Sequence, residues 1–298
     1  MSAPDPSRLT PRAARHGASL RMGRFTLALD RPLIMGVVNV TPDSFSDGGQ
    51  FYGAGQAVEH ARRLVDEGVD ILDVGGESTR PGSSSVTAAE ELRRIAPVLE
   101  AMAHGAVPVS VDTSKPEVMR AAIEAGAAMI NDIYALRQPG ALEAVAARDV
   151  GVCVMHMQGE PRTMQDDPAY GDVVAEVKAF LDERVAACAA AGIERDRIVI
   201  DPGFGFGKKA IHNLELIRGI PALAASGLPV LAGLSRKSVL GKITGRMVGD
   251  RIHSSVAAAL VAVARGARIV RVHDVAATRD ALAVWTAVEA QGMDRNGR

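Results

Sequence analysis

Short apolar runs alternate with longer Ala-rich stretches along most of the chain. Eight of these runs are rich in Val and Ile and show no polar alternation: residues 33–40, 70–76, 107–112, 128–133, 151–157, 197–203, 228–234 and 268–274. Continuous apolar runs of this length are typical of parallel strands that are buried on both faces. Ahead of them, residues 18–29 predict a short β-hairpin that turns at Met22 and Gly23.

Helical stretches separate the eight runs. We expect helices at residues 54–67, 88–104, 116–125, 139–148, 172–191, 212–226, 251–265 and 274–290. Gly68 and Gly105 directly follow two of them, and Pro116 stands in the first turn of a third, which are common helix boundary signals. Eight strand–helix units in about 260 residues predict a single (β/α)8 TIM barrel, with an open doubly wound sheet as the alternative. We assign residues 18–298 to this domain and residues 1–17 to a disordered tail.

Composition narrows the possible partners and compartments. The 298 residues carry 34 Lys and Arg against 35 Asp and Glu, a net charge of −1, so we expect neither nucleic acid nor an anionic membrane surface as a partner. No apolar run approaches the length of about 18 residues that a transmembrane helix needs. The tail lacks the apolar stretch of a secretory signal. Cys153 and Cys188 are too few for a disulfide framework, which indicates buried free thiols and a cytoplasmic location.

Polar side chains gather where the predicted strands end, which is where barrels of this class build their active sites. In chain order they are Asn39, Asp73, Asp112, Asn131, Asp132, His156, Asp201, Lys237, Arg271 and His273, and the apolar Met155 stands beside His156 at the end of the fifth strand. Asp112 and Asp201 follow apolar strands, so we interpret them as site carboxylates. Asp132 and Asp274 precede a predicted helix or turn, and we expect them to cap it.

The types of these residues indicate a ligand with two different ends. The carboxylates Asp112 and Asp201 can bind the amino–imino edge of a flat, nitrogen-rich heterocycle through parallel hydrogen bonds, and Asn131 can add to them. The cationic Lys237, Arg271 and His273 follow the seventh and eighth strands, where such barrels frequently bind phosphate. The sequence therefore predicts a heterocycle at one end of the site and an anion at the other.

Three further features have plainer interpretations. The glycine-rich segment 203–207 lacks the context of a dinucleotide fingerprint. His156 and His212 have no Cys or acidic residue at ligand spacing, so we expect solvated or hydrogen-bonded histidines there. The predicted helix at 251–265 has a wide apolar face at residues 254–264, which suggests a subunit contact.

Eight segments in chain order carry a family resemblance: IMGVVNVTPDSFSDGG (34–49), DILDVGGESTRPG (70–82), VSVDTSKPEV (109–118), MINDI (129–133), MHMQGEPRTMQ (155–165), IDPGFGFGK (200–208), LAGLSRKS (231–238) and RVHDV (271–275). On these segments the chain resembles the dihydropteroate synthases of the folate pathway, from about residue 32 to residue 286. The resemblance implies a Mg²⁺-dependent reaction of 6-hydroxymethyl-7,8-dihydropterin pyrophosphate with p-aminobenzoate, which gives 7,8-dihydropteroate and pyrophosphate. It also implies a homodimer.

The resemblance also implies roles for individual residues. The pterin would be bound by Asp112, Asn131, Asp201 and Lys237, in a pocket lined by Met155, Phe206 and Gly233. Arg271 would lie against the pterin face and meet the diphosphate together with His273, while Asn39 would help to hold Mg²⁺. Thr79, Arg80 and Pro81 match the second-substrate loop, and Ser238 matches the aminobenzoate carboxylate site. Residues 41–53 match a mobile first loop, in which we expect Phe45 to form a wall of the aminobenzoate site.

The chemistry of this reaction agrees with the residue types. Arylamine nitrogen is already neutral and needs no base, so catalysis depends on ionising the pterin C–O bond. Cations beside the departing pyrophosphate and carboxylates beside the pterin cation favour an SN1-like path. Two alternatives stay open, a pterin-binding methyltransferase domain and a non-catalytic pterin-binding homologue. The segments TPDSFSDGG, ESTRPG and SRKS, together with Asn39, favour the synthase.

Overall fold

Eight parallel strands form a barrel in the computed structural model, which describes residues 18–41, 50–78 and 85–289. The strands are β3 (Leu33–Asn39), β4 (Ile71–Gly75), β5 (Val109–Asp112), β6 (Met129–Asp132), β7 (Gly151–Met155), β8 (Ile198–Asp201), β9 (Leu231–Ala232) and β10 (Ile269–Val272). Their order is β8-β7-β6-β5-β4-β3-β10-β9, and a parallel bridge between Ile200 and Val230 joins the two ends. The sheet therefore closes on itself. The predicted barrel is confirmed, and the open sheet is wrong.

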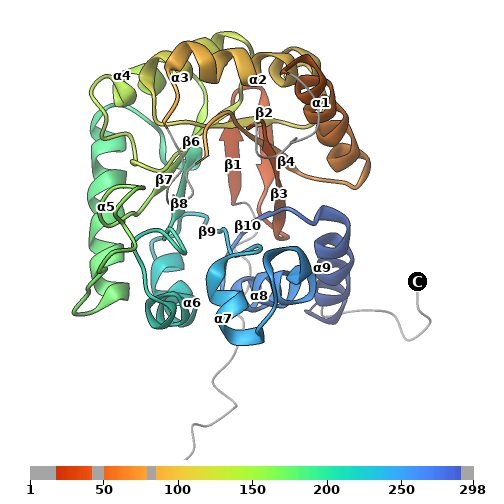
Figure 1. Ribbon diagram of the computed structural model, residues 1–298. Helices are drawn as coiled ribbons and strands as arrows, with labels where there is room; N and C mark the ends of the chain where they lie inside the picture. Colours follow the sequence, from red (N-terminus) through yellow and green to blue (C-terminus); the bar gives the residue numbers. More distant parts are fainter. Residues whose placement is uncertain (1–17, 42–49, 79–84, 290–298) are drawn as a thin grey trace, which may run out of the picture.

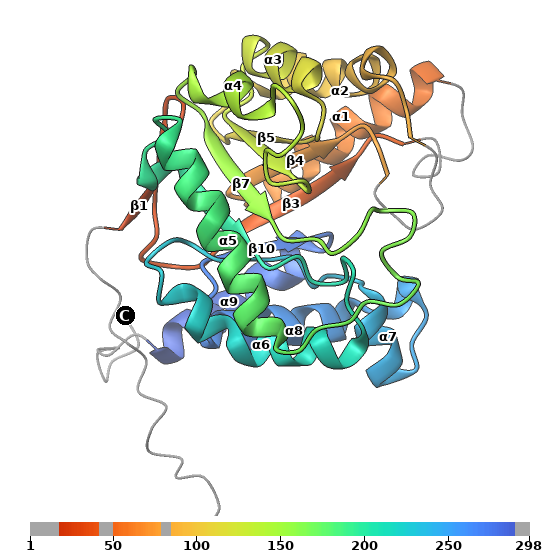
Figure 2. The ribbon, with the colours of Figure 1, turned by 90° about the vertical axis from the view of Figure 1, so that its left-hand side faces the viewer.

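Helices surround this barrel, as Figures 1 and 2 show. They are α1 (Gln50–Asp66), α2 (Ala88–Met102), α3 (Pro116–Glu124), α4 (Ala141–Ala146), α5 (Val173–Ala190), α6 (Ala210–Ala224), α7 (Ser238–Thr244), α8 (Ile252–Ala264) and α9 (Val275–Glu289). Each predicted helix is present, within a few residues at its ends. Both cysteines are buried free thiols. Among the described residues, no helix has the length and apolar character needed to cross a membrane.

The predicted hairpin is confirmed, and it closes one end of the barrel. Strands β1 (Ser19–Met22) and β2 (Phe25–Ala28) pair antiparallel, and Leu20 and Met22 are fully buried. These two side chains belong to an apolar cluster with residues from the barrel interior: Met35, Ile71, Met129, Cys153, Val199, Leu231 and Ile269. In Figure 2 the hairpin lies at the end of the barrel away from the strand arrowheads. An apolar plug therefore fills the N-terminal end, which leaves the opposite mouth for a polar site.

The segment 228–250 differs from the expectation of a long strand followed by a loop. Strand β9 spans only two residues, and Pro229 just before it has no N–H group to donate to a ladder. The helix α7 was not predicted. It has seven residues, contains Gly241 and ends at Gly245 in the left-handed region at φ 71°, so it was too short for a periodic signal. This extra helix brings Ser238 and Lys242 to the mouth of the barrel.

Candidate active site

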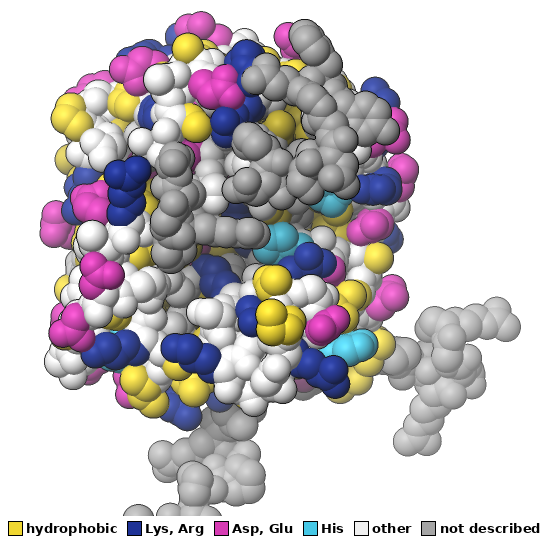
Figure 3. Space-filling view, viewed as in Figure 1, with side chains coloured by type: hydrophobic (Ala, Val, Ile, Leu, Met, Phe, Trp, Pro, Cys, Tyr) yellow, Lys and Arg dark blue, Asp and Glu magenta, His cyan; other side chains and the backbone are white. Residues whose placement is uncertain are grey.

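Polar side chains from five strands converge at the C-terminal mouth. Asp112 and Asn131 are direct register partners on β5 and β6, and Asp201 on β8 is paired with Met155 on β7. Figure 3 looks onto this mouth and shows Lys and Arg side chains in the hollow at its centre. The strand-end residues that the sequence singled out are thus brought to one edge of the barrel, because parallel strands all end on the same side.

Arg271 joins two carboxylates across this mouth. Its Nε donates to Asp73 Oδ2 at 2.6 Å, and its Nη2 donates to Asp112 Oδ2 at 2.8 Å. Asn131 Nδ2 donates to the same oxygen of Asp73 at 3.2 Å. Asp73 is fully buried, so one carboxylate fixes the orientation of both the arginine and the amide. The sequence did not predict this role for Asp73. The one feature that could have indicated it is a carboxylate inside an otherwise apolar strand, since a buried charge needs a partner.

Burial raises the pKa values of two aspartates at the mouth and lowers the pKa of a lysine beside them. Burial raises the pKa of Asp112 to about 7, while the Arg271 guanidinium opposes the rise. Burial also raises the pKa of Asp201, against the charge of Lys237. The Lys237 pKa is lowered by burial to about 8, and the Asp201 carboxylate limits that fall. Since Asp112 and Lys237 titrate close to physiological pH, they can accept or donate protons in hydrogen bonds to a heterocycle.

The glycine-rich β8–α6 loop holds Asp201 and Lys237 in place. Asp201 Oδ1 accepts a hydrogen bond from the Gly203 amide at 2.7 Å. Gly203 has a φ of 68°, and a Cβ atom there would stand 1.9 Å from the carbonyl oxygen of His156, so only glycine fits. Lys237 Nζ donates to the Phe204 carbonyl and lies 4.6 Å from the centre of the Phe206 ring. The loop therefore provides a backbone frame for a carboxylate and an ammonium group.

His156 and Lys208 form a buried pair behind this loop. Lys208 Nζ lies 2.9 Å from His156 Nδ1 and donates to the Phe206 carbonyl at the same distance. Burial lowers the pKa of Lys208 to about 7. Burial also lowers the pKa of His156 to about 3, and the positive charge of Lys208 lowers it further. The imidazole is therefore neutral and accepts from the ammonium group. His212 accepts from the Lys209 amide at 3.2 Å, so both histidines make hydrogen bonds, as the sequence suggested.

The remaining predicted pocket residues lie beside these groups. Met155 packs in a small apolar cluster with Ile133, and Phe206 packs against that cluster. A Cβ atom on Gly233 would lie 3.9 Å from both Lys237 Nζ and Arg271 Cβ, so the glycine leaves space between the two cations. The walls are thus apolar, while the charged groups project from strand ends.

Asn39 ends β3, and His273 directly follows the neighbouring strand β10. His273 Nδ1 is 3.0 Å from the hydroxyl of Ser235. Asn39 provides an amide oxygen, a ligand type that Mg²⁺ accepts while it keeps water and phosphate oxygens in its other positions. Among the described residues, no group of three His, Cys, Asp or Glu side chains is arranged to hold a metal on its own.

The two aspartates expected to cap elements have structural contacts. Asp132 accepts from the amides of Tyr134 at 2.9 Å and Leu136 at 2.7 Å, so it caps the turn after β6 as predicted. Asp274 instead forms an ion pair with Arg236, whose Nε lies 3.1 Å away.

A partly buried ion cluster lies beside the mouth, between β4 and the start of α3. Lys115 Nζ donates to Glu91 Oε2 at 2.6 Å and also to Glu77. Glu77 Oε1 accepts from the amide of Val86 at 3.0 Å, which links the two ends of the β4–α2 connection. The predicted second-substrate residues Thr79, Arg80 and Pro81 lie in this connection, outside the described residues, as does Phe45 in the first loop.

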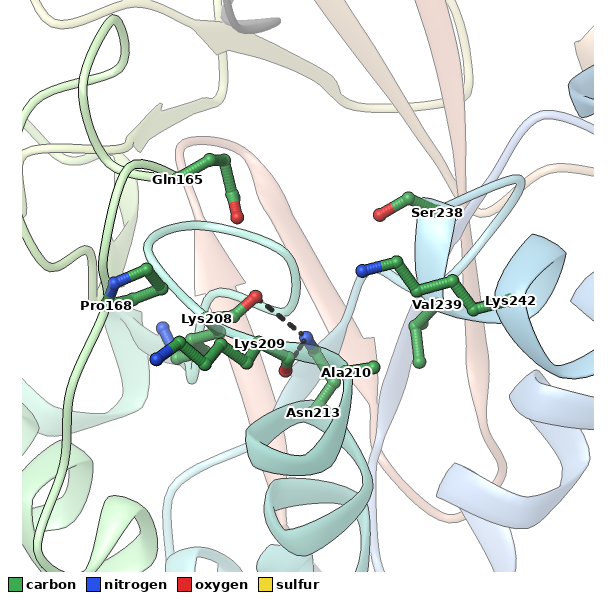
Figure 4. Close-up of a pocket in the computed structure, with 9 residues that line it drawn as sticks. All are labelled: Gln165, Pro168, Lys208, Lys209, Ala210, Asn213, Ser238, Val239 and Lys242. Carbon is green, nitrogen blue, oxygen red and sulfur yellow. Dashed lines mark hydrogen bonds between the residues drawn. The ribbon is translucent and has the colours of Figure 1, made fainter.

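A cavity of about 120 Å³ lies next to Ser238, between the starts of α6 and α7. Its lining residues are Gln165, Pro168, Lys208, Lys209, Ala210, Asn213, Ser238, Val239 and Lys242. Figure 4 shows the Ser238 hydroxyl and the Lys242 ammonium group directed toward the same space. The cavity lies against the β8–α6 loop, which also holds Asp201 and Lys237 in place. Gln165, one of the lining residues, donates from Nε2 to the Gly205 carbonyl of this loop at 2.5 Å.

The fold and the site together define a TIM barrel with carboxylates and cations gathered at its C-terminal mouth, and comparison with known proteins identifies the family. The family model described as pterin binding enzyme matches residues 35–273. Dihydropteroate synthase from Neisseria meningitidis serogroup B is 54% identical over 273 residues, which cover 89% of this chain and 96% of that protein. The chain therefore belongs to the dihydropteroate synthases, transferases that make dihydropteroate.

Solved structures agree with this assignment. Xanthomonas albilineans dihydropteroate synthase with 4-aminobenzoic acid has a TM-score of 0.86 and 57% identity, covering 92% of this chain and 100% of that chain. The same enzyme in complex with 7,8-dihydropteroate has a TM-score of 0.84 and 54% identity, with the same coverage.

Proposed function

We propose that this chain condenses 6-hydroxymethyl-7,8-dihydropterin pyrophosphate with p-aminobenzoate to form 7,8-dihydropteroate and pyrophosphate. The observation that carries the proposal is the pair of carboxylates, the buried Asp201 and the partly buried Asp112, beside the cations Arg271 and Lys237 at one barrel mouth. A pterin ring carries an amino–imino edge that a carboxylate can bind with two parallel hydrogen bonds. The membership of the chain in the synthase family supports the same reaction.

Each end of the pterin substrate has its own set of residues in this proposal. Asp201 binds the amino–imino edge, and Asp112 and Asn131 bind the rest of the polar rim. Lys237 donates to the ring carbonyl or a ring nitrogen. Met155, Phe206 and Gly233 form apolar contacts with the ring. Because Asp201 is buried and Asp112 is partly buried, their negative charge is weakly screened by water and acts on a cation beside them.

The anionic end of the pterin ester meets Arg271 and His273. Charge grows on the pyrophosphate oxygen as the C–O bond breaks, and donors fixed at that position lower the barrier. Arg271 is already oriented by Asp73, so little reorganisation is needed. Asn39 would hold Mg²⁺, which supplies further neutralisation of the diphosphate when it is bound. The carboxylates stabilise the delocalised pterin cation, and the neutral arylamine then adds to it in an SN1-like path.

The second substrate approaches from the side of Ser238. We assign its carboxylate to the Ser238 hydroxyl, and its ring to Thr79, Arg80 and Pro81 with Phe45. No protein base is required, because the amine reacts in its neutral form and loses its proton after the new C–N bond has formed. A closed site would protect the pterin cation from water until the amine arrives.

We also propose that the chain forms a homodimer in the cytoplasm through the face made by α7, α8 and α9. Large apolar side chains are exposed there: Ile243, Met247, Val248, Val261, Val284 and Val288. Figure 3 shows hydrophobic side chains on the surface near α7. An exposed apolar group of this kind is typical of a subunit interface. The molar mass in solution, measured by light scattering, tests this part.

One assay tests the proposed reaction. Purified protein is mixed with the pterin pyrophosphate, Mg²⁺ and p-aminobenzoate, and both pyrophosphate and dihydropteroate are measured. We expect equal amounts of the two products, and a loss of both with EDTA or without the pterin ester. A methyltransferase domain or a non-catalytic homologue would bind pterin and release no pyrophosphate, which would overturn the proposal.

A further inference from the structure

The cavity beside Ser238 is lined by cations and contains no acidic side chain. Three lysines, Lys208, Lys209 and Lys242, are among its lining residues, and Asp and Glu are absent from them in the described part of the chain. The other walls are formed by small apolar groups and by amide or hydroxyl donors. A small cavity of this composition favours a negatively charged group over a neutral one, since each positive charge lowers the energy of an anion nearby.

The three lysines differ in what their ammonium groups contact. Lys208 Nζ is buried and directed away from the cavity, because it donates to His156 Nδ1 and to the Phe206 carbonyl. Lys209 Nζ forms an ion pair with Asp167 at 2.9 Å, so its charge is largely compensated. Lys242 Nζ makes no ion pair or hydrogen bond with any residue that the structure describes. Its charge is thus the one within the described lining that is available to a ligand.

Helix geometry directs Lys242 and Ser238 to the same ligand atoms. The two residues are separated by four positions on α7, so their side chains lie on one face of the helix. Figure 4 shows both polar ends directed into the cavity, opposite Gln165. A carboxylate that accepts from the Ser238 hydroxyl would therefore lie in the field of the Lys242 ammonium group.

From these contacts we infer that Lys242 is a specificity-determining residue, which selects an arylamine with a negative charge at the end opposite its amino group. This inference rests on the proposed function, because it takes Ser238 as the site of the aminobenzoate carboxylate. The selection acts on substrate binding. It does not act on the breaking of the pterin C–O bond, because Lys242 would contact the carboxylate end of the arylamine and not the pterin ester.

The test compares a charged and a neutral arylamine in four proteins: the native chain, Lys242→Met, Lys242→Arg and the control Lys178→Met. Lys178 is an exposed lysine on α5 that pairs with Asp182, so its replacement makes the same change in net charge away from the cavity. Kinetic constants are measured for p-aminobenzoate and for the pterin pyrophosphate. The neutral p-aminobenzamide is measured as a competitive inhibitor, so no turnover of it is needed. Thermal unfolding checks the fold of each variant.

We expect Lys242→Met to raise the KM for p-aminobenzoate about two- to fivefold, as the loss of a charge interaction at an exposed lysine would. The kcat, the KM for the pterin ester and the inhibition constant of p-aminobenzamide should stay unchanged. Lys242→Arg should restore the KM, Lys178→Met should leave it unaltered, and added salt should reduce the effect.

Two results would overturn the inference. One is an unchanged KM for p-aminobenzoate in a folded Lys242→Met protein. The other is an equal loss for the charged and the neutral arylamine, which would indicate a steric or structural role. If the native chain itself makes no dihydropteroate, the proposed function fails instead, so the two failures can be told apart.

Discussion

Replacing Asp201 by Asn changes one atom of the site and leaves its frame in place. In the native chain Asp201 Oδ1 accepts from the Gly203 amide at 2.7 Å, and the amide oxygen of Asn can keep that bond. The amide NH2 then takes the place of Oδ2, the oxygen that would face the pterin edge. Two donors would meet there, the amide and the pterin amino group. The fold should therefore survive while the ligand contact is lost.

The expected loss follows from the hydrogen bonds that Asp201 would make. Hydrogen bonds to a charged group contribute about 1.5–3 kcal/mol each, so two of them are worth roughly 3–6 kcal/mol. This corresponds to pterin binding that is weaker by a factor of roughly 10² to 10⁴. A second effect adds to the first. The Asp201 carboxylate limits the fall in the Lys237 pKa, so in the variant that pKa should drop below its value of about 8.

Calorimetric titration with the free hydroxymethyl pterin at pH 6, 7 and 8 measures both effects. Asp132→Asn is the matched control, since it makes the same change at the end of β6, which is separated from β8 by β7. Asp132 caps a turn through the Tyr134 and Leu136 amides, so its variant should lose about 1 kcal/mol of stability and keep its pterin affinity. An Asp201→Asn protein that is folded and binds pterin with native affinity would refute the reasoning.

Three other perturbations have defined outcomes. Arg271→Ala or His273→Ala should reduce kcat with the pyrophosphate ester roughly 100- to 1,000-fold. Either change should weaken the binding of free pterin less than the binding of its pyrophosphate ester, and equal losses of affinity for the two would contradict this. The His156 pKa of about 3 lies below the pKa of a free histidine. At pH values between the two, this histidine binds more protons in the unfolded chain than in the folded one. Its contribution to stability therefore falls as the pH falls through this range. The raised Asp112 pKa acts in the opposite sense and is common to both proteins, so the comparison is between the native chain and His156→Gln. In urea unfolding, the change in stability from pH 7 to pH 5 should be less favourable by about 2 kcal/mol in the native chain than in His156→Gln. Lys115→Met should destabilise the fold by about 3–5 kcal/mol, because Glu91 is left buried without its cation. In the same unfolding assay, the double variant with Glu91→Gln should recover part of that loss. No recovery would show that the lost stability does not come from the unpaired Glu91 carboxylate.

The sequence determined the barrel and the edge on which the site lies. Continuous Val- and Ile-rich runs indicate strands buried on both faces, and helices between them force a parallel sheet. All parallel strands end on the same side, so Asp112 and Asp201 could be placed at one mouth from their positions in the chain. The family motifs then suggested a role for each residue at that mouth. Capping by Asp132 followed equally from local sequence.

Only the tertiary structure decided which of these groups touch. The contact between Arg271 and Asp73 joins residues 198 positions apart, and nothing local in either segment specifies it. It depends on closure of the barrel, which places β10 beside β3 and β4 beyond it. The direction of Lys242 was equally hidden, because α7 is too short to produce a periodic pattern. Local patterns report which face of a strand or helix is buried, whereas distances between side chains, and the pKa shifts that follow from burial, depend on how all the elements pack.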